Sequence, residues 1–227
     1  MDTTFSKSNS SVIAFTVWLA AVILVFGSLG IYGSKQGARS LPPKQWPSDS
    51  SLERSTEAST LLVFVHPECP CSRATLENLT TIASNPSLSV VIVCIDVDSN
   101  LATSSNDFAS CRKQLDEWQQ QTNVTLVQDT DGSETRRFQA ATSGHCLLFD
   151  SQGTLKFSGG ATSSRGHEGA SAGLASLKSA LNGHTEPETY PVFGCPLFLE
   201  PEDPPANNRQ QVPESLLPSC CKGSCRA

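Results

Sequence analysis

Residues 61–79 read LLVFVHPECPCSRATLENL, an apolar run followed by a turn and a helix-like pattern. The run at 61–65 is continuous, which is typical of a strand buried on both faces. After it, Cys69 and Cys71 stand one residue apart with a proline between them. The apolar positions of residues 72–84 then recur at close to helical spacing. The stretch predicts a buried strand that turns into a helix, with two thiols at the turn.

Strands and helices alternate through the following part of the chain. The pattern predicts strands at 89–97, 124–129, 145–150 and 154–159, and helices at 105–121, 133–141 and 169–182. The early strand-helix-strand units require right-handed crossovers and parallel strands, whereas the hairpin at 145–159 adds antiparallel ones. We therefore expect an α/β fold in which a mixed β-sheet is flanked by helices on both faces.

An apolar segment lies near the N-terminus. Residues 12–32 read VIAFTVWLAAVILVFGSLGIY and contain no charged side chain. At ~1.5 Å per residue, such a helix matches a bilayer core of ~30 Å. A signal-peptide core is shorter, at ~7–15 residues, and no clean cleavage site follows. We therefore expect an uncleaved, single-pass transmembrane anchor that attaches the protein to the membrane.

Composition divides the rest of the chain. Residues 1–11 form an N-terminal tail, and the Ser- and Pro-rich residues 33–59 form a linker. The globular domain is expected at 60–183. Residues 184–227 carry eight of the fourteen prolines and four of the nine cysteines, and are predicted to form an extended tail. This tail ends in SCCKGSC, whose cysteines could bind a soft metal or form disulfides: Cys220, Cys221 and Cys225.

Charge and cysteine content limit the partner and the compartment. The formal net charge is −6 and no basic patch is evident, which speaks against nucleic acid as a partner. Nine cysteines favour an oxidising compartment. The flanking charges favour the opposite orientation, because only Lys7 precedes the apolar segment while Lys35, Arg39 and Lys44 follow it. We predict a domain in the periplasm or another extracytoplasmic space, against the bias of these charges.

The position of the two thiols suits thiol chemistry. Reactive groups in open α/β sheets gather at the carboxyl ends of strands. The unpaired N–H groups and the dipole of a helix N-terminus stabilise a thiolate, and can lower a cysteine pKa from ~8.5 to ~3.5–7.5. Cys69 and Cys71 are therefore the predicted catalytic residues.

The order of the elements and their motifs resembles the thioredoxin-like superfamily, in particular its exported TlpA-like and peroxiredoxin-like branch. LLVFVHPECPC resembles the strand, turn and active-site cysteine of that superfamily, and residues 129–160 resemble its later turn, helix and hairpin. More narrowly, CPCSRA, SGHCLLFD, SGGATSSRGHEG and PVFGCPLF resemble bacterial RedB-type thioredoxin-like proteins. The resemblance implies a thioredoxin-like fold over residues 60–183 and thiol–disulfide exchange with a protein partner.

The resemblance also assigns places within the motif. Cys69 falls on the first cysteine of the superfamily's C-x-x-C motif, and Ser72 falls on the second. Cys71 takes the place of the intervening proline. Gly144, followed by His145, stands where the superfamily has its cis-proline. Because that proline normally shields the thiols from metals, its replacement makes metal binding easier to envisage.

Three roles for the Cys69–Cys71 pair stay open at this point. The pair could form a tight, oxidising disulfide, because an i, i+2 pair spans at most ~7 Å. The two sulfurs could instead bind a soft ion such as Cu(I), with a third ligand from elsewhere. The turn could also have no chemistry, which would leave a thioredoxin-fold interaction module. No organic cofactor is expected, because neither a G-x-G-x-x-G nor a Walker-type loop is present.

Three other residues are candidates for auxiliary roles. His66 stands just before the pair and could lower a thiol pKa or serve as a ligand. The resemblance places His145 facing Cys69. Cys195 lies in VFGCPLF, an apolar patch that we expect to dock on the domain, where it could be a resolving thiol or a third metal ligand. The remaining cysteines of the domain are predicted to be buried small apolar residues: Cys94, Cys111 and Cys146.

Overall fold

A computed structural model describes residues 4–38, 40–67, 69–85, 87–95, 106–183 and 188–198, with side chains except at 4–10, 106–112 and 188. The prediction for the Cys111 side chain lies outside the described residues. So do the predictions for residues 96, 97 and 105, for the tail at 184–187 and 199–227, and hence for its three terminal cysteines.

A mixed sheet forms the centre of the domain, with strand order β3-β2-β1-β4-β5-β6. Strand β1 pairs in parallel with β2, and β2 in parallel with β3. On its other side β1 pairs antiparallel with β4, which pairs antiparallel with β5. The strands are β1 (Ser59–Val65), β2 (Leu88–Ile95), β3 (Val124–Asp129), β4 (His145–Phe149), β5 (Leu155–Gly160) and β6 (Glu188–Thr189).

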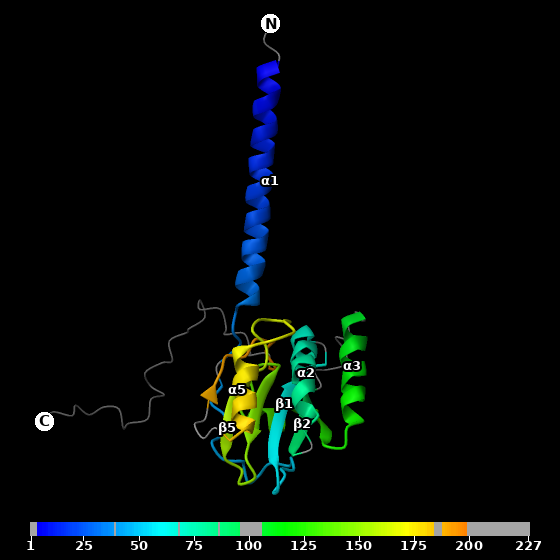
Figure 1. The fold of residues 1–227 in the computed structure, drawn as a ribbon. Helices are drawn as coiled ribbons and strands as arrows, with labels where there is room; N and C mark the ends of the chain where they lie inside the picture. Colours follow the sequence, from blue (N-terminus) through cyan, green and yellow to red (C-terminus); the bar gives the residue numbers. More distant parts are fainter. Residues whose placement is uncertain are drawn as a thin grey trace, which may run out of the picture. The chain divides into compact units, whose positions relative to one another are not determined.

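Three helices cover one face of this sheet, as Figure 1 shows. Each has an apolar stripe that joins the buried core, as in Leu76 and Leu79 of α2, Trp118 of α3 and Leu177 of α5. Leu61, Val63 and Val65 alternate along β1 toward the same core. The helices are α2 (Pro70–Ala83), α3 (Asn106–Gln119) and α5 (Ala172–Leu181).

The other face is covered by α4 (Ser133–Arg137) and by part of the predicted linker. Trp46 packs edge-on against Phe138 and Phe149, with ring centroids 5.1 and 5.2 Å away. Residues 44 and 46 pair with the start of β5, through Leu155 N–H to the Lys44 carbonyl and Trp46 N–H to the Gly153 carbonyl. The segment that follows the apolar helix is therefore packed on the domain. Its Trp46 adds to the aromatic cluster on this face of the sheet.

A buried carboxylate holds the same segment to α4. Glu134 is 4% exposed, and its two carboxylate oxygens accept hydrogen bonds from Ser51 N–H at 3.0 Å and Ser50 Oγ at 2.7 Å. Arg137 pairs with Glu134 and, at 3.0 Å, with Asp49. The Ser- and Pro-rich composition of residues 33–59 predicted a linker instead. The bonds of Ser50 and Ser51 to Glu134 join residues more than 80 positions apart, which composition does not reveal.

The sheet also continues beyond residue 183, where we placed the end of the domain. β6 pairs in parallel with β5, and Tyr190 stacks on Phe157 at a centroid distance of 6.1 Å. Leu197 is buried at 3% exposure, and its N–H donates to the Ala141 carbonyl. We call residues 188–198 the C-terminal strap.

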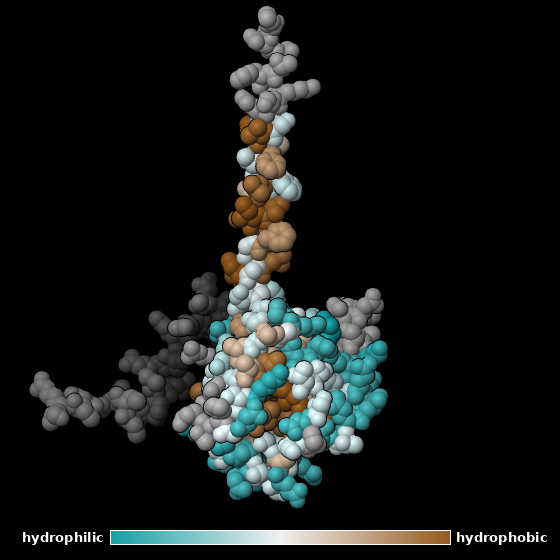
Figure 2. Space-filling model, viewed as in Figure 1, coloured by the Kyte–Doolittle hydropathy of each residue, from teal (hydrophilic) through white to brown (hydrophobic). Residues whose placement is uncertain are grey.

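Helix α1 (Thr4–Gly33) contains the apolar segment. Its residues Ser11–Gly33 have a mean hydropathy of 2.5 and none of their most apolar window is buried, so the helix is long and apolar enough to span a membrane. Figure 2 shows apolar side chains along its length. The predicted fold class is confirmed in its architecture: a mixed α/β sheet flanked by helices, with an apolar N-terminal helix.

Candidate functional site

The strand-to-helix turn places the two predicted thiols at one edge of the sheet. β1 ends at Val65, and Cys69 is the N-cap residue of α2 with extended backbone angles (φ −104°, ψ 120°). Pro70 begins the helix, because its fixed φ suits the first helical position and it has no N–H to satisfy. Cys69 and Cys71 are buried, at 2% and 5% exposure.

A loop from the antiparallel half of the sheet meets this turn. Phe64 of β1 is in register with His145, the first residue of β4, and the Gly144 N–H donates to the Phe64 carbonyl at 2.8 Å. Gly144 has a φ of +86°, and a Cβ there would lie 2.6 Å from Thr75 Oγ1 of α2. Glycine is required at this position by both the backbone conformation and the close approach of the loop to the helix.

Ser72 links the turn to that loop. Its hydroxyl accepts from the His66 N–H at 3.0 Å, donates to the His66 carbonyl at 2.7 Å, and lies 2.6 Å from Ser143 Oγ. A second cysteine of a C-x-x-C motif would stand at this position. In this chain the hydroxyl instead fixes the backbone around the thiols.

The C-terminal strap brings a third cysteine to the same place. Ser143 N–H donates to the Cys195 carbonyl at 2.8 Å, and Thr142 and Pro196 form an antiparallel bridge. A Cβ on Gly194 would lie 1.9 Å from the Ser143 carbonyl oxygen, so only glycine allows the strap to approach this closely. The strap therefore runs antiparallel to residues 141–143.

The result is a cluster of three sulfur atoms. Cys69 Sγ lies 3.0 Å from Cys195 Sγ, and the sulfurs of Cys69, Cys71 and Cys195 all lie within 4.8 Å of one another. Among the described residues no other side chain belongs to a cluster of this kind. In the sequence, the apolar patch VFGCPLF around Cys195 is the signal for its docking here as a resolving thiol or a third metal ligand.

The three thiols differ in acidity. Hydrogen bonds from the thiols of Cys195 and Cys71 stabilise a thiolate at Cys69 and lower its pKa far below the ordinary range. The pKa of Cys71 is raised by its hydrogen bonds with Cys195 and with Cys69, and the pKa of Cys195 is raised chiefly by its hydrogen bond with Cys69. The arrangement favours a thiolate at Cys69 and protonated thiols at Cys71 and Cys195.

The two candidate histidines, His145 and His66, lie outside the sulfur cluster and differ in burial. The structure does not bring His145 into the cluster: the side chain is 1% exposed, and its Nε2 lies 2.9 Å from Ser158 Oγ of β5. Burial lowers its pKa to about 4. His66 precedes the turn and is partly exposed, and its backbone N–H and carbonyl hold Ser72. Neither imidazole belongs to the group of potential metal ligands.

The remaining described cysteines lie in strands. Cys146 is fully buried in the core next to α2 and α5, and burial raises its pKa to about 12. Cys94 on β2 is partly buried and packs against the same core. Both side chains therefore pack as small apolar residues do. The raised pKa of Cys146 keeps its thiol protonated at neutral pH.

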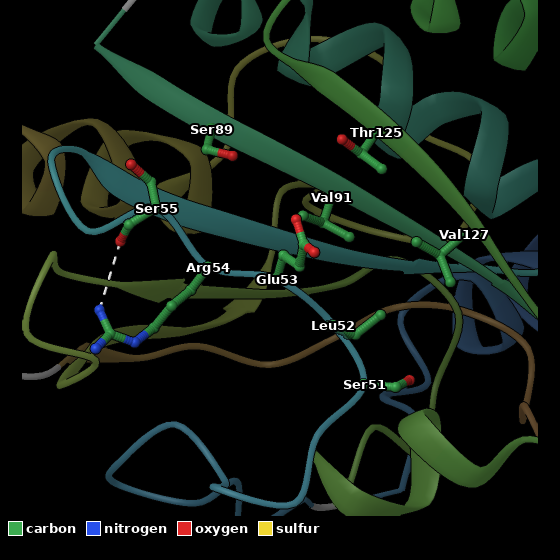
Figure 3. A pocket seen from close by; sticks show the side chains of 9 residues that line it. All are labelled: Ser51, Leu52, Glu53, Arg54, Ser55, Ser89, Val91, Thr125 and Val127. Carbon is green, nitrogen blue, oxygen red and sulfur yellow. Dashed lines mark hydrogen bonds between the residues drawn. The ribbon is translucent and has the colours of Figure 1, made fainter.

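One hollow in the described part of the chain is lined by residues other than the cysteines. It has a volume of about 420 Å³ and lies between residues 51–55 and the strands β2 and β3, whose Ser89, Val91, Thr125 and Val127 line it (Figure 3). Its lining contains neither cysteine nor histidine. The thiol cluster is therefore the candidate reactive site.

Comparison with known proteins gives a fold but no family. No family model and no curated protein matches the chain. An uncharacterised conserved protein from Geobacillus kaustophilus superimposes with a TM-score of 0.51 and 18% identity, over 74% of this chain and 94% of its own. A hypothetical protein from Sinorhizobium meliloti does so at 0.50 and 17%, over 72% and 93%.

A secreted Mycobacterium tuberculosis disulfide oxidoreductase homologous to E. coli DsbE overlaps less. Its TM-score is 0.38 at 15% identity, over 57% of this chain and 84% of its own. The two more similar structures show that the chain shares its fold with these two proteins over more than nine-tenths of their own length.

Proposed function

We propose that the protein is a thiol–disulfide oxidoreductase in which Cys69 is the nucleophile and Cys195 the resolving thiol. The observation that carries the proposal is the 3.0 Å separation of their sulfur atoms at the N-terminus of α2. The lowered pKa of Cys69 supports the assignment of the nucleophile, because thiol–disulfide exchange requires a thiolate.

The reaction has two exchange steps. The Cys69 thiolate attacks one sulfur of a substrate disulfide, which forms a mixed disulfide and releases the other sulfur as a thiolate that takes up a proton. The Cys195 thiol then loses its proton and attacks Cys69 Sγ, which forms the Cys69–Cys195 disulfide and releases the first substrate sulfur as a thiol. Two electrons pass from the protein to the substrate, and an external dithiol restores the starting state.

The partner we propose is an extended, disulfide-containing protein segment. Cys195 reaches Cys69 because the strap pairs with residues 141–143 through backbone contacts. A substrate peptide could use the same backbone groups when the strap moves aside.

Redox titration followed by disulfide mapping tests the proposal. The purified chain is equilibrated with glutathione and glutathione disulfide, alkylated and digested. We expect a peptide pair linked by Cys69 and Cys195, absent from the Cys195→Ser variant and unchanged in a Cys94→Ser control. Exclusive formation of a Cys69–Cys71 disulfide would contradict Cys195 as the resolving thiol. Failure of Cys69 to form any disulfide would favour the interaction module without chemistry.

We further propose that helix α1 anchors the domain on the extracytoplasmic side of the membrane, which the cysteine content supports and the flanking charges oppose. An impermeant thiol reagent added to intact cells should label Cys69 of the reduced protein. Labelling that requires cell lysis would place the domain in the cytoplasm.

The narrower likeness to RedB-type proteins is also a proposal, carried by CPCSRA and PVFGCPLF. It predicts that a RedB-type structure has the same strap, with its cysteine against the first thiol of the CPC motif. A RedB-type structure without that contact would count against it.

A further inference from the structure

Cys71 has no part in the exchange between Cys69 and Cys195, yet its surroundings are those of a site residue. It is buried on the first turn of α2, at 5% exposure. Its sulfur lies within 4.8 Å of both other sulfurs. No histidine or carboxylate of the described residues joins this cluster, so its ligand set consists of sulfur alone.

We propose that Cys69, Cys71 and Cys195 form a three-thiolate site for Cu(I). Thiolates are soft ligands and select soft ions such as Cu(I). Structural zinc and iron–sulfur sites use four ligands, whereas d¹⁰ Cu(I) is satisfied by three. Metal–sulfur bonds of about 2.3 Å in a trigonal arrangement place the sulfurs about 4 Å apart. The observed separations are 3.0 Å for Cys69 and Cys195 and no more than 4.8 Å for the other two pairs, and side-chain rotation brings the sulfurs into that arrangement.

The backbone around the three ligands is held in place before any ion binds. Cys69 N–H donates to the His66 carbonyl at 3.1 Å, and the Cys69 carbonyl accepts from Ser72 N–H at 2.9 Å. The contact between Ser72 Oγ and Ser143 Oγ joins this turn to the residue that holds the Cys195 carbonyl. Ligands on a fixed backbone lose little conformational freedom when they bind an ion.

Copper and disulfide exclude each other at this site. Formation of the Cys69–Cys195 disulfide consumes the Cys69 thiolate and the Cys195 thiol and passes two electrons to a disulfide such as glutathione disulfide, whose two sulfurs leave as glutathione thiols after taking up the Cys195 proton and one proton from water. It leaves Cys71 as the only thiol of the cluster. Cu(I) therefore binds the reduced protein and slows its oxidation. The mutual exclusion of copper and disulfide rests on the proposed function. Binding of Cu(I) to the three reduced cysteines does not depend on it.

The test uses the full-length chain with Cys220, Cys221 and Cys225 changed to Ser, so that the terminal cysteines cannot bind the ion. The reduced protein is titrated anaerobically with Cu(I) against a chromophoric Cu(I) chelator. We expect one Cu(I) per chain, and X-ray absorption that shows sulfur ligands only, three in number. Cys71→Ser and Cys195→Ser should each weaken binding at least tenfold, whereas the control Cys94→Ser should not.

Cys71→Ser separates the copper site from the redox function. In this variant the Cys69–Cys195 disulfide should form with glutathione disulfide more slowly, because the hydrogen bond from the Cys71 thiol to Cys69 is lost, while the Cu(I) affinity falls at least tenfold. Unchanged Cu(I) affinity in Cys71→Ser, less than one Cu(I) per chain, or equal binding by the oxidised protein would each overturn the proposal. The thermal unfolding temperature of each variant, measured in the same detergent, shows that a loss of binding is not a loss of fold.

Discussion

Cys69 combines burial with ionisation, which ordinarily oppose each other. Desolvation alone raises a thiol pKa, as at Cys146, where burial raises it to about 12. At Cys69 the neighbouring thiols reverse the effect, because hydrogen bonds from Cys195 and Cys71 stabilise the negative sulfur. The reactive thiol therefore depends on its neighbours for its charge.

This difference predicts selective alkylation in acid. In the reduced protein, Cys69 should react with iodoacetamide at pH 5–6, where an ordinary thiol with a pKa of ~8.5 is less than about 1% ionised. Cys146 should not react in the folded protein at any pH near neutrality. Mass spectrometry of digested protein after timed alkylation measures both rates. A Cys69 rate that rises about tenfold per pH unit from 5 to 8 would show an ordinary pKa.

His145 should make the fold sensitive to acid. Its pKa is lowered to about 4 by burial, from an unfolded value of ~6.5. The unfolded chain therefore binds a proton before the folded chain does, and stability is lost as the pH falls from 6.5 to 4. The full loss is about 3 kcal/mol.

His145→Gln removes this contribution and keeps a side chain that can bond Ser158. Denaturant unfolding at pH 7, 5.5 and 4 should show a smaller acid loss in the variant than in the natural protein. Equal slopes of stability against pH would mean that the pKa of His145 in the folded state is close to its unfolded value.

The sequence predicted Cys69 and Cys71 at the turn because strand, turn and helix are encoded within twenty consecutive residues. Cys195 could only be a hypothesis, because it contacts Cys69 across 126 residues of chain. The apolar run at 145–150 likewise predicted that His145 begins a strand. The direction of its side chain, toward Ser158, depends on the pairing of β4 with β5.

At the scale of elements, the periodic segments were predictable and the aperiodic ones were not. Strands and helices of the domain show their period in the sequence, and they fall within a few residues of the predicted bounds. The linker and the strap have no such period. Isolated apolar residues fix them instead, such as Trp46 and Leu52 on one side and Leu197 on the other.

The strap predicts the behaviour of a glycine variant. Gly194→Ala places a methyl group where the Ser143 carbonyl oxygen lies, so the strap must shift and carry Cys195 away from Cys69. We expect formation of the Cys69–Cys195 disulfide by glutathione disulfide to slow at least tenfold, as measured by quenched alkylation. Gly183→Asn is the matched control, because nothing lies within 4 Å of a Cβ there and Asn tolerates its φ of +92°. Oxidation of Gly194→Ala at the natural rate would mean that the strap does not position Cys195.

At the scale of the whole molecule, helix α1 differs from every other helix described. Its apolar side chains are exposed around its circumference, as in Leu24 at 73% and Phe26 at 69%, whereas α2 buries one face. A helix that is apolar on all sides has no core to join in water and suits a lipid environment.

A charge in this helix should release the protein from the membrane. Leu24→Arg places a cation near the middle of the apolar segment, at a cost of about 2.5–3.5 kcal/mol for insertion. We expect a larger share of the chain in the carbonate-soluble fraction than for a Leu24→Ala control. Equal retention of the two variants in the membrane pellet would argue against a spanning helix.

The antiparallel bridge between Thr142 and Pro196 also bears on how partners are caught. A thiol tethered beside its target acts at an effective concentration of millimolar or more, which free thiols in solution seldom match. If Cys195 is the resolving thiol, as proposed, any mixed disulfide on Cys69 is short-lived, because Cys195 expels the partner before it can be isolated. Changing Cys195 to serine stops the second step and leaves the first intact, which turns the protein into a covalent trap for its own substrates.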